Sequence, residues 1–282
     1  MRLTFLFAAA IASTTMLATS AFAADYEPPV VTVDDPVEYV PVEVGSGWYL
    51  RGDIGYNFAT RTSGTFDYRT FDALTGTYGQ AQFDTARMRS DVTVGAGFGY
   101  RLNEWFRADA TVEYFRARFD GTTTSATPCL GTPAFAGTTC RSEDEARVKA
   151  LSFMLNAYVD LGTYVGFTPY AGAGVGYTML TWEGLNGNNY CVGAACPIGL
   201  AGTSVNPGVK DWRFTYAAMA GVSYDISKNL KVDLGYRYRK ISGGSMFNWD
   251  AASAALGATG VQGRDPGLST HEIRLGLRYE LW

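Results

Sequence analysis

Strict alternation of apolar and polar residues is the feature that most constrains the fold of this chain. In its last segment, Ile273, Leu275 and Leu277 share one parity, whereas Glu272 and Arg274 hold the other. A period of two indicates a β-strand with one apolar face. Eight segments show this alternation: 47–59, 86–101, 105–119, 146–161, 166–182, 211–226, 229–242 and 270–282. Each is long enough to cross a bilayer at a tilt, so the repetition predicts eight membrane-crossing strands.

The connections between these segments alternate in length. Short turns occur at 102–104, 162–165 and 227–228, while polar stretches of about 26 to 28 residues separate the other pairs, as in barrels with short periplasmic turns. Unpaired backbone groups in hydrocarbon cost several kcal/mol each, so the last segment should pair with the one near Trp48 and close the sheet. The predicted fold class is all-β: an antiparallel up-and-down transmembrane β-barrel of eight strands, with short periplasmic turns and long extracellular loops.

Aromatic residues cluster near the ends of the predicted strands, where amphipathic rings favour the membrane–water interface. They are Trp48, Tyr56, Phe58, Tyr100, Trp105, Phe106, Tyr114, Tyr177, Trp212, Phe214, Tyr224, Tyr238 and Tyr279.

The N-terminal part of the chain differs from the rest in composition. Residues 1–23 combine Arg2, an apolar run and a small-x-small ending at Ala23, which predicts a signal peptide cleaved before Ala24. The apolar run is only about 15 residues, short of the roughly 20 that an anchoring helix needs. Residues 24–46 are acidic and Pro-rich and predict an extended periplasmic leader, and 47–282 form the barrel domain.

Parity places many charged residues in the lumen of the predicted barrel. They are Arg51, Asp53, Arg107, Asp109, Glu113, Asp160, Arg213, Asp225, Lys231, Asp233, Arg237, Arg239, Glu272, Arg274, Arg278 and Glu280. Their signs nearly balance, and an eight-stranded interior is just wide enough for side chains to fill it. We therefore expect a crosslinked ion-pair core, and the alternative is the lining of a narrow channel.

Two motifs inside the predicted strands resemble functional signatures. The glycines of the runs 95–99 and 172–176 fall on the inward parity, which favours space for bulky inner neighbours over a phosphate-binding loop. Arg51-Gly52-Asp53 spells a cell-adhesion tripeptide, but both charged side chains should point into the lumen, out of reach of a receptor.

The four cysteines form two close pairs, each within one predicted extracellular loop. Cys129 with Cys140, and Cys191 with Cys196, are expected to form loop-pinning disulfides in an oxidising compartment. The alternative, a metal site shared by all four thiolates, would need reduced cysteines outside the cell. We expect no metal site and no cofactor.

The single histidine, His271, lies at the extracellular end of the last strand, with Ser269 two residues before it. Some outer-membrane lipid A hydrolases place a serine and a histidine on the lipid-facing surface, because a hydroxyl nucleophile needs an adjacent base. The other interpretation is an interfacial histidine near lipid headgroups. No further motif supports catalysis, so the expectation is that the protein is not an enzyme.

Three stretches carry a family resemblance: Gly-Trp-Tyr-Leu-Arg-Gly-Asp-Ile-Gly-Tyr at 47–56, Gly-Tyr-Arg-Tyr at 235–238 and Leu-Arg-Tyr-Glu-Leu-Trp at 277–282. Together with the export signal, they resemble the small outer-membrane β-barrel proteins of Gram-negative bacteria, variously porin-like, OmpA-like or opacity-type. The likeness covers 47–282 and implies residence in the cell outer membrane. It also implies a C-terminal assembly signal at Tyr279 and Trp282, although Leu281 holds the outward parity where the family usually ends in an aromatic.

The implied partners are outer-membrane lipid and lipopolysaccharide and, during biogenesis, the barrel-assembly machinery and periplasmic chaperones. The formal net charge of −4 argues against a nucleic-acid partner. The leading hypothesis is a structural surface protein that contributes to envelope integrity and presents extracellular loops. A narrow porin-like channel for small solutes is the alternative, and a lipid A hydrolase is a distant one.

Overall fold

The structure is a computed structural model that describes residues 47–62, 64–125, 138–193, 196 and 200–281. The predicted signal peptide and acidic leader lie outside the described residues. Within the described part, twelve strands form one antiparallel sheet. Among these residues, no helix is long and apolar enough to cross a membrane.

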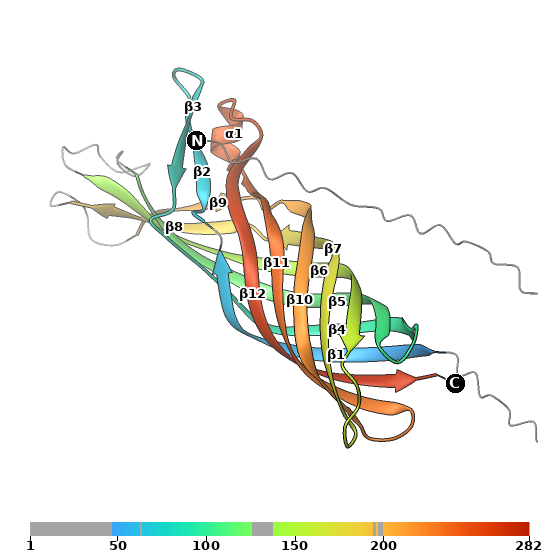
Figure 1. Ribbon diagram of the computed structural model, residues 1–282. Helices are drawn as coiled ribbons and strands as arrows, with labels where there is room; N and C mark the ends of the chain where they lie inside the picture. The colour runs from blue at the N-terminus through green and yellow to red at the C-terminus, as the bar shows by residue number, and fades with distance from the viewer. Residues whose placement is uncertain (1–46, 63, 126–137, 194–195, 197–199, 282) are drawn as a thin grey trace, which may run out of the picture. The chain divides into compact units, whose positions relative to one another are not determined.

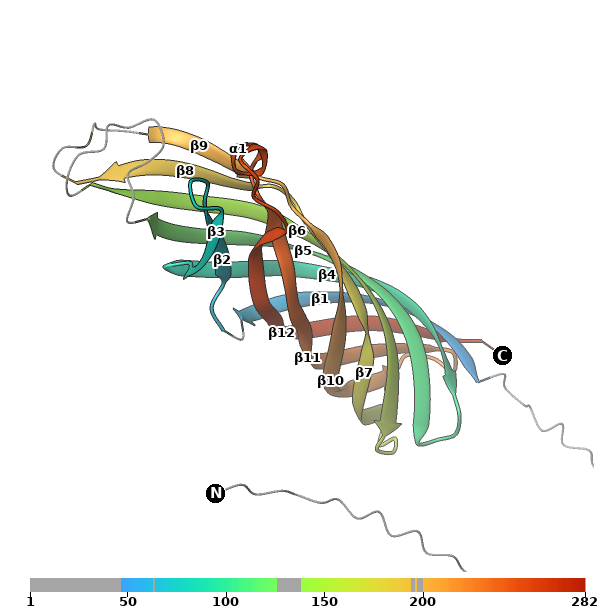
Figure 2. The ribbon, with the colours of Figure 1, turned by 90° about the horizontal axis from the view of Figure 1, so that it is seen from above.

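Eight strands form a closed ring, shown in Figures 1 and 2. In ring order they are β1 (Trp48–Thr62), β4 (Thr85–Arg101), β5 (Phe106–Ser125), β6 (Thr139–Asp160), β7 (Phe167–Trp182), β10 (Lys210–Asp225), β11 (Leu230–Asn248) and β12 (Val261–Glu280). Each pairs with its neighbours in antiparallel register. The predicted antiparallel barrel class is confirmed.

The first and last ring strands close the barrel. Tyr49 lies opposite Glu280 in this pairing, and the backbone N–H of Leu281 donates to the carbonyl of Trp48 at 2.8 Å. The pairing continues to Thr62, with one irregularity between Asn57 and Ala59. The predicted contact between the two ends of the barrel is therefore present.

Within the described residues, the long connections contain ordered strands, which the prediction of long loops did not include. β5, β6, β11 and β12 contain 20, 22, 19 and 20 residues, whereas a tilted crossing needs about 9–11. These strands continue past the predicted crossing on the side of the long connections. Their backbone pairing therefore continues well beyond the thickness of a bilayer.

Four shorter strands and one helix extend this end of the sheet. β2 (Asp67–Asp72) pairs with β3 (Thr77–Gln82) and meets β12 through Tyr68 and Asp67. β8 (Leu185–Val192) pairs with both β6 and β9 (Leu200–Asn206). The helix α1 (Ala251–Ala255) lies between β11 and β12 and is capped by Asp250. We call these parts the extracellular platform.

The outward face of the ring carries exposed apolar side chains on its strands, among them Leu234, Leu275 and Val175. Aromatic pairs flank this apolar band. At the short-turn end, Phe167 stacks near Tyr224 with ring centroids 4.7 Å apart. At the other end, Tyr177 and Phe214 are 5.9 Å apart, in the arrangement expected at membrane interfaces.

Candidate functional site

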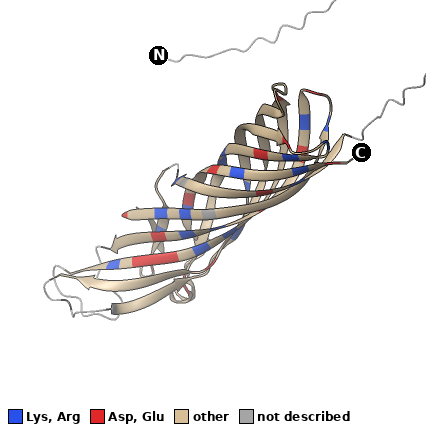
Figure 3. Cartoon of the chain, turned by 90° about the horizontal axis from the view of Figure 1, so that it is seen from below, with Lys and Arg blue, Asp and Glu red and all other residues tan. Residues whose placement is uncertain are grey.

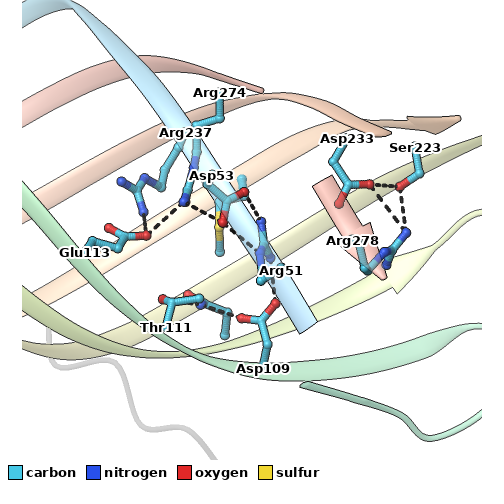
Figure 4. Close-up of polar contacts among 12 residues, drawn as sticks. Arg51, Asp53, Asp109, Thr111, Glu113, Ser223, Asp233, Arg237, Arg274 and Arg278 are labelled. Carbon is cyan, nitrogen blue, oxygen red and sulfur yellow. Dashed lines mark hydrogen bonds and ion pairs between the residues drawn. The ribbon is translucent and has the colours of Figure 1, made fainter. Parts of the chain in front are cut away.

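A network of ion pairs crosses the barrel lumen, and Figure 4 shows most of its members. It joins β1, β5, β11 and β12 and contains four arginines and four carboxylates: Arg51, Asp53, Asp109, Glu113, Arg237, Arg239, Glu272 and Arg274. All eight side chains are buried. The network is formally neutral, so no net charge is left in the barrel interior at this level.

Glu113 is the centre of this network. Its carboxylate pairs with Arg237, with Arg239 at 3.2 Å and with Arg274 at 3.0 Å. Arg274 also reaches Asp53 at 3.3 Å, which links the centre to the pair of Arg51 and Asp53 at 2.7 Å. Removing one partner of such a buried set leaves an uncompensated charge, at a cost of about 3–5 kcal/mol.

The glycines of the inner face make room for this packing. A Cβ on Gly97 would lie 2.6 Å from the carbonyl oxygen of Ala110, and one on Gly172 would lie 2.8 Å from that of Ala157 and 2.5 Å from the ring of Tyr158. Both glycines stand on the inward parity of their strands, opposite bulky luminal groups. Their role is spatial, because the runs that contain them lie within β4 and β7 and open no helix.

The remaining luminal charges form smaller groups. Arg107 pairs with Asp160 at 3.0 Å and stacks 4.1 Å over the ring of Tyr158. Arg278 pairs with Asp233 at 3.4 Å.

Two more groups lie nearer the strand ends. Arg213 pairs with Asp265 at 2.5 Å, and Lys231 pairs with Asp225 at 2.5 Å. Glu280 differs from the prediction in its surroundings, because it pairs with Arg101 at the rim and stays partly exposed, apart from the central network.

An apolar layer fills the lumen on the platform side of the ionic network. Its largest members are Phe115, Phe119, Trp182, Ile241 and Phe247, all buried. Trp182 packs edge-on against Phe247, with ring centroids 5.1 Å apart. The charge-based prediction missed this layer.

A sequence signal for the layer was present in β5. Up to Glu113 the inward positions are polar, but from Phe115 through Phe119 they are apolar and the outward positions, Arg116 and Arg118, are charged. Where the strand leaves the apolar band, its inward face therefore changes from polar to apolar and its outward face changes from apolar to charged.

The two fillings leave little space in the lumen at the level of the network. A cavity beside Arg51, Asp53, Tyr158 and Asp233 has a volume of about 10 Å³. This is about the room that one water molecule needs.

The tripeptide Arg51-Gly52-Asp53 lies in the lumen. The Arg51 guanidinium donates to both carboxylate oxygens of Asp53, at 2.7 and 2.9 Å, and to Asp109 at 2.6 Å. Both charged side chains are buried. A receptor at the cell surface has no access to them.

One cysteine pair forms a disulfide within the platform. Cys191 is bonded to Cys196 with a Cα–Cα distance of 5.5 Å, and it pins the end of the β8–β9 hairpin. Cys140 lies in β6 directly opposite Cys191 and is also disulfide-bonded. Cys129 lies outside the described residues, so its pairing stays a prediction. Among the described residues, no cluster of metal-ligating side chains is present.

His271 lies on the outward face among aromatic rings. Its Nδ1 is 2.7 Å from the Tyr236 hydroxyl, and its ring lies 6.1 Å from Phe58 and 5.3 Å from Tyr238. Ser269 is buried and accepts from the Tyr238 hydroxyl at 3.4 Å. Tyr236, and not Ser269, is the hydrogen-bond partner of His271, so the two residues do not form a nucleophile–base pair. Of the predicted assembly signal, Tyr279 is exposed on the outer wall and Trp282 lies outside the described residues.

The platform is held together by aromatic contacts between distant loops. Arg69 of β2 stacks 4.0 Å over Tyr78 of β3, and Trp249 lies 5.9 Å from Tyr78. The Tyr78 hydroxyl accepts the backbone N–H of Thr259 at 2.9 Å. These contacts join the β2–β3 hairpin to the connection between β11 and β12.

Comparisons with known proteins agree with this architecture. Residues 9–280 match the family model described as "Outer membrane protein beta-barrel domain". An uncharacterised protein of Brucella abortus (strain 2308) is 36% identical over 261 residues, covering 88% of this chain and 90% of that protein. A "Putative adhesin" of Rickettsia felis is 25% identical over 247 residues, covering 85% and 90%.

Among solved structures, Neisserial surface protein A is similar at a TM-score of 0.43 and 18% identity, covering 85% of this chain and 100% of that one. The closed antiparallel ring, its apolar outer band and the match over nearly the whole sequence lead to one assignment. This chain belongs to the outer membrane protein β-barrel domain family and is a protein of the bacterial outer membrane.

Proposed function

We propose that this protein is a non-conducting, non-enzymatic surface protein whose barrel anchors the extracellular platform and contributes to envelope integrity. The observation that carries this proposal is the double filling of the lumen. A solute would have to separate the ion pairs around Glu113 and then displace the rings of Phe119, Trp182 and Phe247. The interior therefore favours an anchor over a channel.

The surface that remains for contact with other molecules is the platform. At its tips, Leu74 in the β2–β3 turn is 98% exposed and Leu256 beside α1 is 64% exposed. An exposed apolar side chain gains free energy when a partner surface removes it from water. The likeness to a protein named "Putative adhesin" supports a role in attachment for the same face.

The first test is single-channel recording of the purified, folded protein in planar bilayers. We expect no stepwise conductance at any applied voltage that the bilayer tolerates. Folding is checked on the same sample by its migration in SDS with and without heating, since a closed barrel resists unheated detergent. Regular conductance steps from the folded sample would replace this proposal with the porin-like alternative.

The second test measures attachment of cells that display the protein. The variant Leu74→Ser/Leu256→Ser should reduce attachment to host-cell or abiotic surfaces at least twofold. The matched control, Leu102→Ser/Leu161→Ser, alters two exposed leucines at the short-turn end and should attach like the unchanged protein. Equal attachment by all three proteins would remove the platform tips from the proposal.

A further inference from the structure

Six basic side chains gather on the outer wall of β4, β5 and β6, just beyond the apolar band. They are Arg87, Arg89, Arg116, Arg118, Arg147 and Lys149, and all are exposed. They line one open groove of about 940 Å³. Figure 3 shows blue segments side by side on neighbouring strands in this part of the sheet, with red beyond them toward the strand ends.

The register of the strands sets three arginines in one row. Arg89 lies opposite Arg118, and Arg118 lies opposite Arg147. Directly opposed side chains have Cβ atoms about 4.5–5.5 Å apart, and like charges at that spacing are destabilising. Within the described residues, no ion pair or hydrogen bond joins these three guanidinium groups to a carboxylate. The row therefore repels itself and would be stabilised by an anion.

The carboxylates of the groove are Asp120, Glu143, Asp144, Glu145 and Glu183, and within the described residues none of them forms an ion pair with an arginine of this row. Asp120 and Glu145 face each other in the next row outward, level with Arg87. Glu183 pairs with Lys149 at 2.6 Å, and Glu143 lies 3.4 Å from Arg141. Asp144 is buried on the inward parity. One carboxylate, Glu183, lies beside Arg147 at the end of the row, whereas Asp120 and Glu145 lie one row farther from the apolar band, so the three arginines keep an excess of positive charge.

The depth of the row matches the headgroup region of a membrane. On β5 the outward positions run from Val112 through Tyr114 to Arg116 and Arg118, about 7 Å per two residues. The Nε of Arg116 donates to the Tyr114 hydroxyl at 2.8 Å, so this guanidinium is held at the edge of the band. On β6, Phe153 is exposed on the outward parity below Lys149. The apolar wall and the basic row therefore form one continuous surface along the same strands.

The geometry points to a binding site for the phosphorylated headgroup of an outer-leaflet lipid, with the phosphates on Arg89, Arg118 and Arg147 and the acyl chains along Val92, Val112 and Phe153. A guanidinium group binds two phosphate oxygens through paired hydrogen bonds, whereas an ammonium group acts as a point charge. A row of arginines therefore suits a phosphorylated ligand better than a row of lysines. A free phosphate would gain nothing from the apolar wall. A lipid uses both surfaces.

The test measures lipid binding by native mass spectrometry of the full, folded protein. The probes are lipid A carrying two phosphates, the same lipid dephosphorylated, and inorganic pyrophosphate. We expect the unchanged protein to bind the two-phosphate lipid at least tenfold more tightly than the dephosphorylated one. Pyrophosphate should bind weakly. Equal binding of the two lipids, or pyrophosphate binding as tight as that of lipid, would overturn the assignment.

The variant Arg89→Ala/Arg118→Ala/Arg147→Ala should lose at least tenfold in affinity for the two-phosphate lipid. The control, Arg61→Ala/Lys210→Ala/Arg264→Ala, removes the same number of exposed positive charges from β1, β10 and β12 and should change the affinity less than twofold. Equal losses of affinity in both variants would mean that lipid binding depends only on the net charge of the protein. That result would contradict a binding site at the arginine row.

If the alanine variant does not fold, Arg89→Lys/Arg118→Lys/Arg147→Lys is the second variant. It keeps the positive charge and removes the paired N–H donors of the guanidinium groups. It should bind with intermediate affinity, and affinity equal to that of the unchanged protein would contradict phosphate recognition by guanidinium groups. Neither conductance nor attachment enters these measurements, so their outcome is separate from that of the proposed function.

Discussion

At the scale of single residues, one buried carboxylate in the lumen pairs with several arginines. Glu113 contacts three arginines from β11 and β12, although 124 residues separate it from Arg237 along the chain. All four side chains are buried. A buried carboxylate in this position stabilises the barrel mainly by preventing unpaired guanidinium groups.

Glu113→Ala should therefore lower the free energy of unfolding by about 3–5 kcal/mol, because it leaves the buried network with one uncompensated positive charge. Urea unfolding of the folded protein in lipid vesicles measures the change. The control is Glu143→Ala, whose exposed pair with Arg141 contributes at most about 1 kcal/mol. Similar losses in the two variants would contradict a special role for the buried network.

At the platform, Asp250 gives a prediction about pH. Partial burial of Asp250 opposes ionisation, but hydrogen bonds from Ser253, with Oγ at 2.6 Å, and from the backbone of Ala252, at 2.9 Å, outweigh it and lower the pKa of the carboxyl. A lowered folded-state pKa means that the cap's contribution is present above the ordinary value of about 3.9 and is lost as pH falls through the folded value.

The protection of the α1 amides against hydrogen exchange, measured relative to an unstructured chain at the same pH, should therefore fall below about pH 4 and stay unchanged between pH 5 and 7. Asp250→Ala should destabilise this turn by about 0.5–2 kcal/mol at neutral pH. Asp250→Asn keeps an acceptor without the titration and should remove the pH dependence. Persistence of the acid-induced change in the asparagine variant would assign it to another group.

His271 provides a prediction about chemistry. Because its Nδ1 faces the Tyr236 hydroxyl, it has no serine nucleophile to activate. Lipid A mass spectra should be identical for cells with and without the protein, and His271→Ala should leave them unchanged. A loss of acyl chains that depends on His271 would restore the hydrolase alternative.

At the scale of elements, β8 and β9 form a hairpin that joins the ring through the pairing of β8 with β6. In the described part of the chain, β9 pairs with β8 and with no ring strand, and the disulfide of Cys191 and Cys196 closes the end of their hairpin. Because their backbone pairing lies beyond the bilayer, water can replace each hydrogen bond when the hairpin opens. The disulfide therefore matters locally.

Cys191→Ser/Cys196→Ser should raise the hydrogen exchange of β8 and β9 by the equivalent of about 2 kcal/mol, the entropy of closing a loop with a sequence separation of 5. The ring strands should keep their exchange rates. Reduction of the unchanged protein also breaks the disulfide of Cys140, so it should raise the exchange of β8 and β9 at least as much. Loss of protection throughout the barrel would mean that the hairpin supports the ring.

The whole molecule is built from a closed wall with two different fillings. The ionic network and the apolar layer of Phe119 and Phe247 lie one above the other, and each spans the lumen by itself. Removal of one should therefore leave the other as a seal. Stability and impermeability are separate properties in such a barrel.

Phe119→Ala/Phe247→Ala should destabilise the barrel by about 3–5 kcal/mol for each ring that it removes, less any relaxation. The folded fraction should nevertheless stay silent in planar bilayers, because the network around Glu113 persists. Stepwise conductance in this variant, with none in the unchanged protein, would identify the apolar layer as the sole seal.

Sequence alone determined the wall of this barrel. Alternation is a local property with a period of two, so the residues of 270–282 already show which side chains face lipid, and unpaired backbone in hydrocarbon demands closure between Tyr49 and Glu280. The inward parity of Arg51, Asp53 and Glu113 followed from the same rule.

Tertiary structure decided the partners and the platform. Which arginine meets Glu113 depends on strand tilt and register around the whole ring, and no local pattern contains that information. Beyond the bilayer, water satisfies the backbone and relaxes the demand for alternation, so β2, β3, β8 and β9 could not be predicted from polar sequence. The row of Arg89, Arg118 and Arg147 likewise exists only through the register that sets three distant strands side by side.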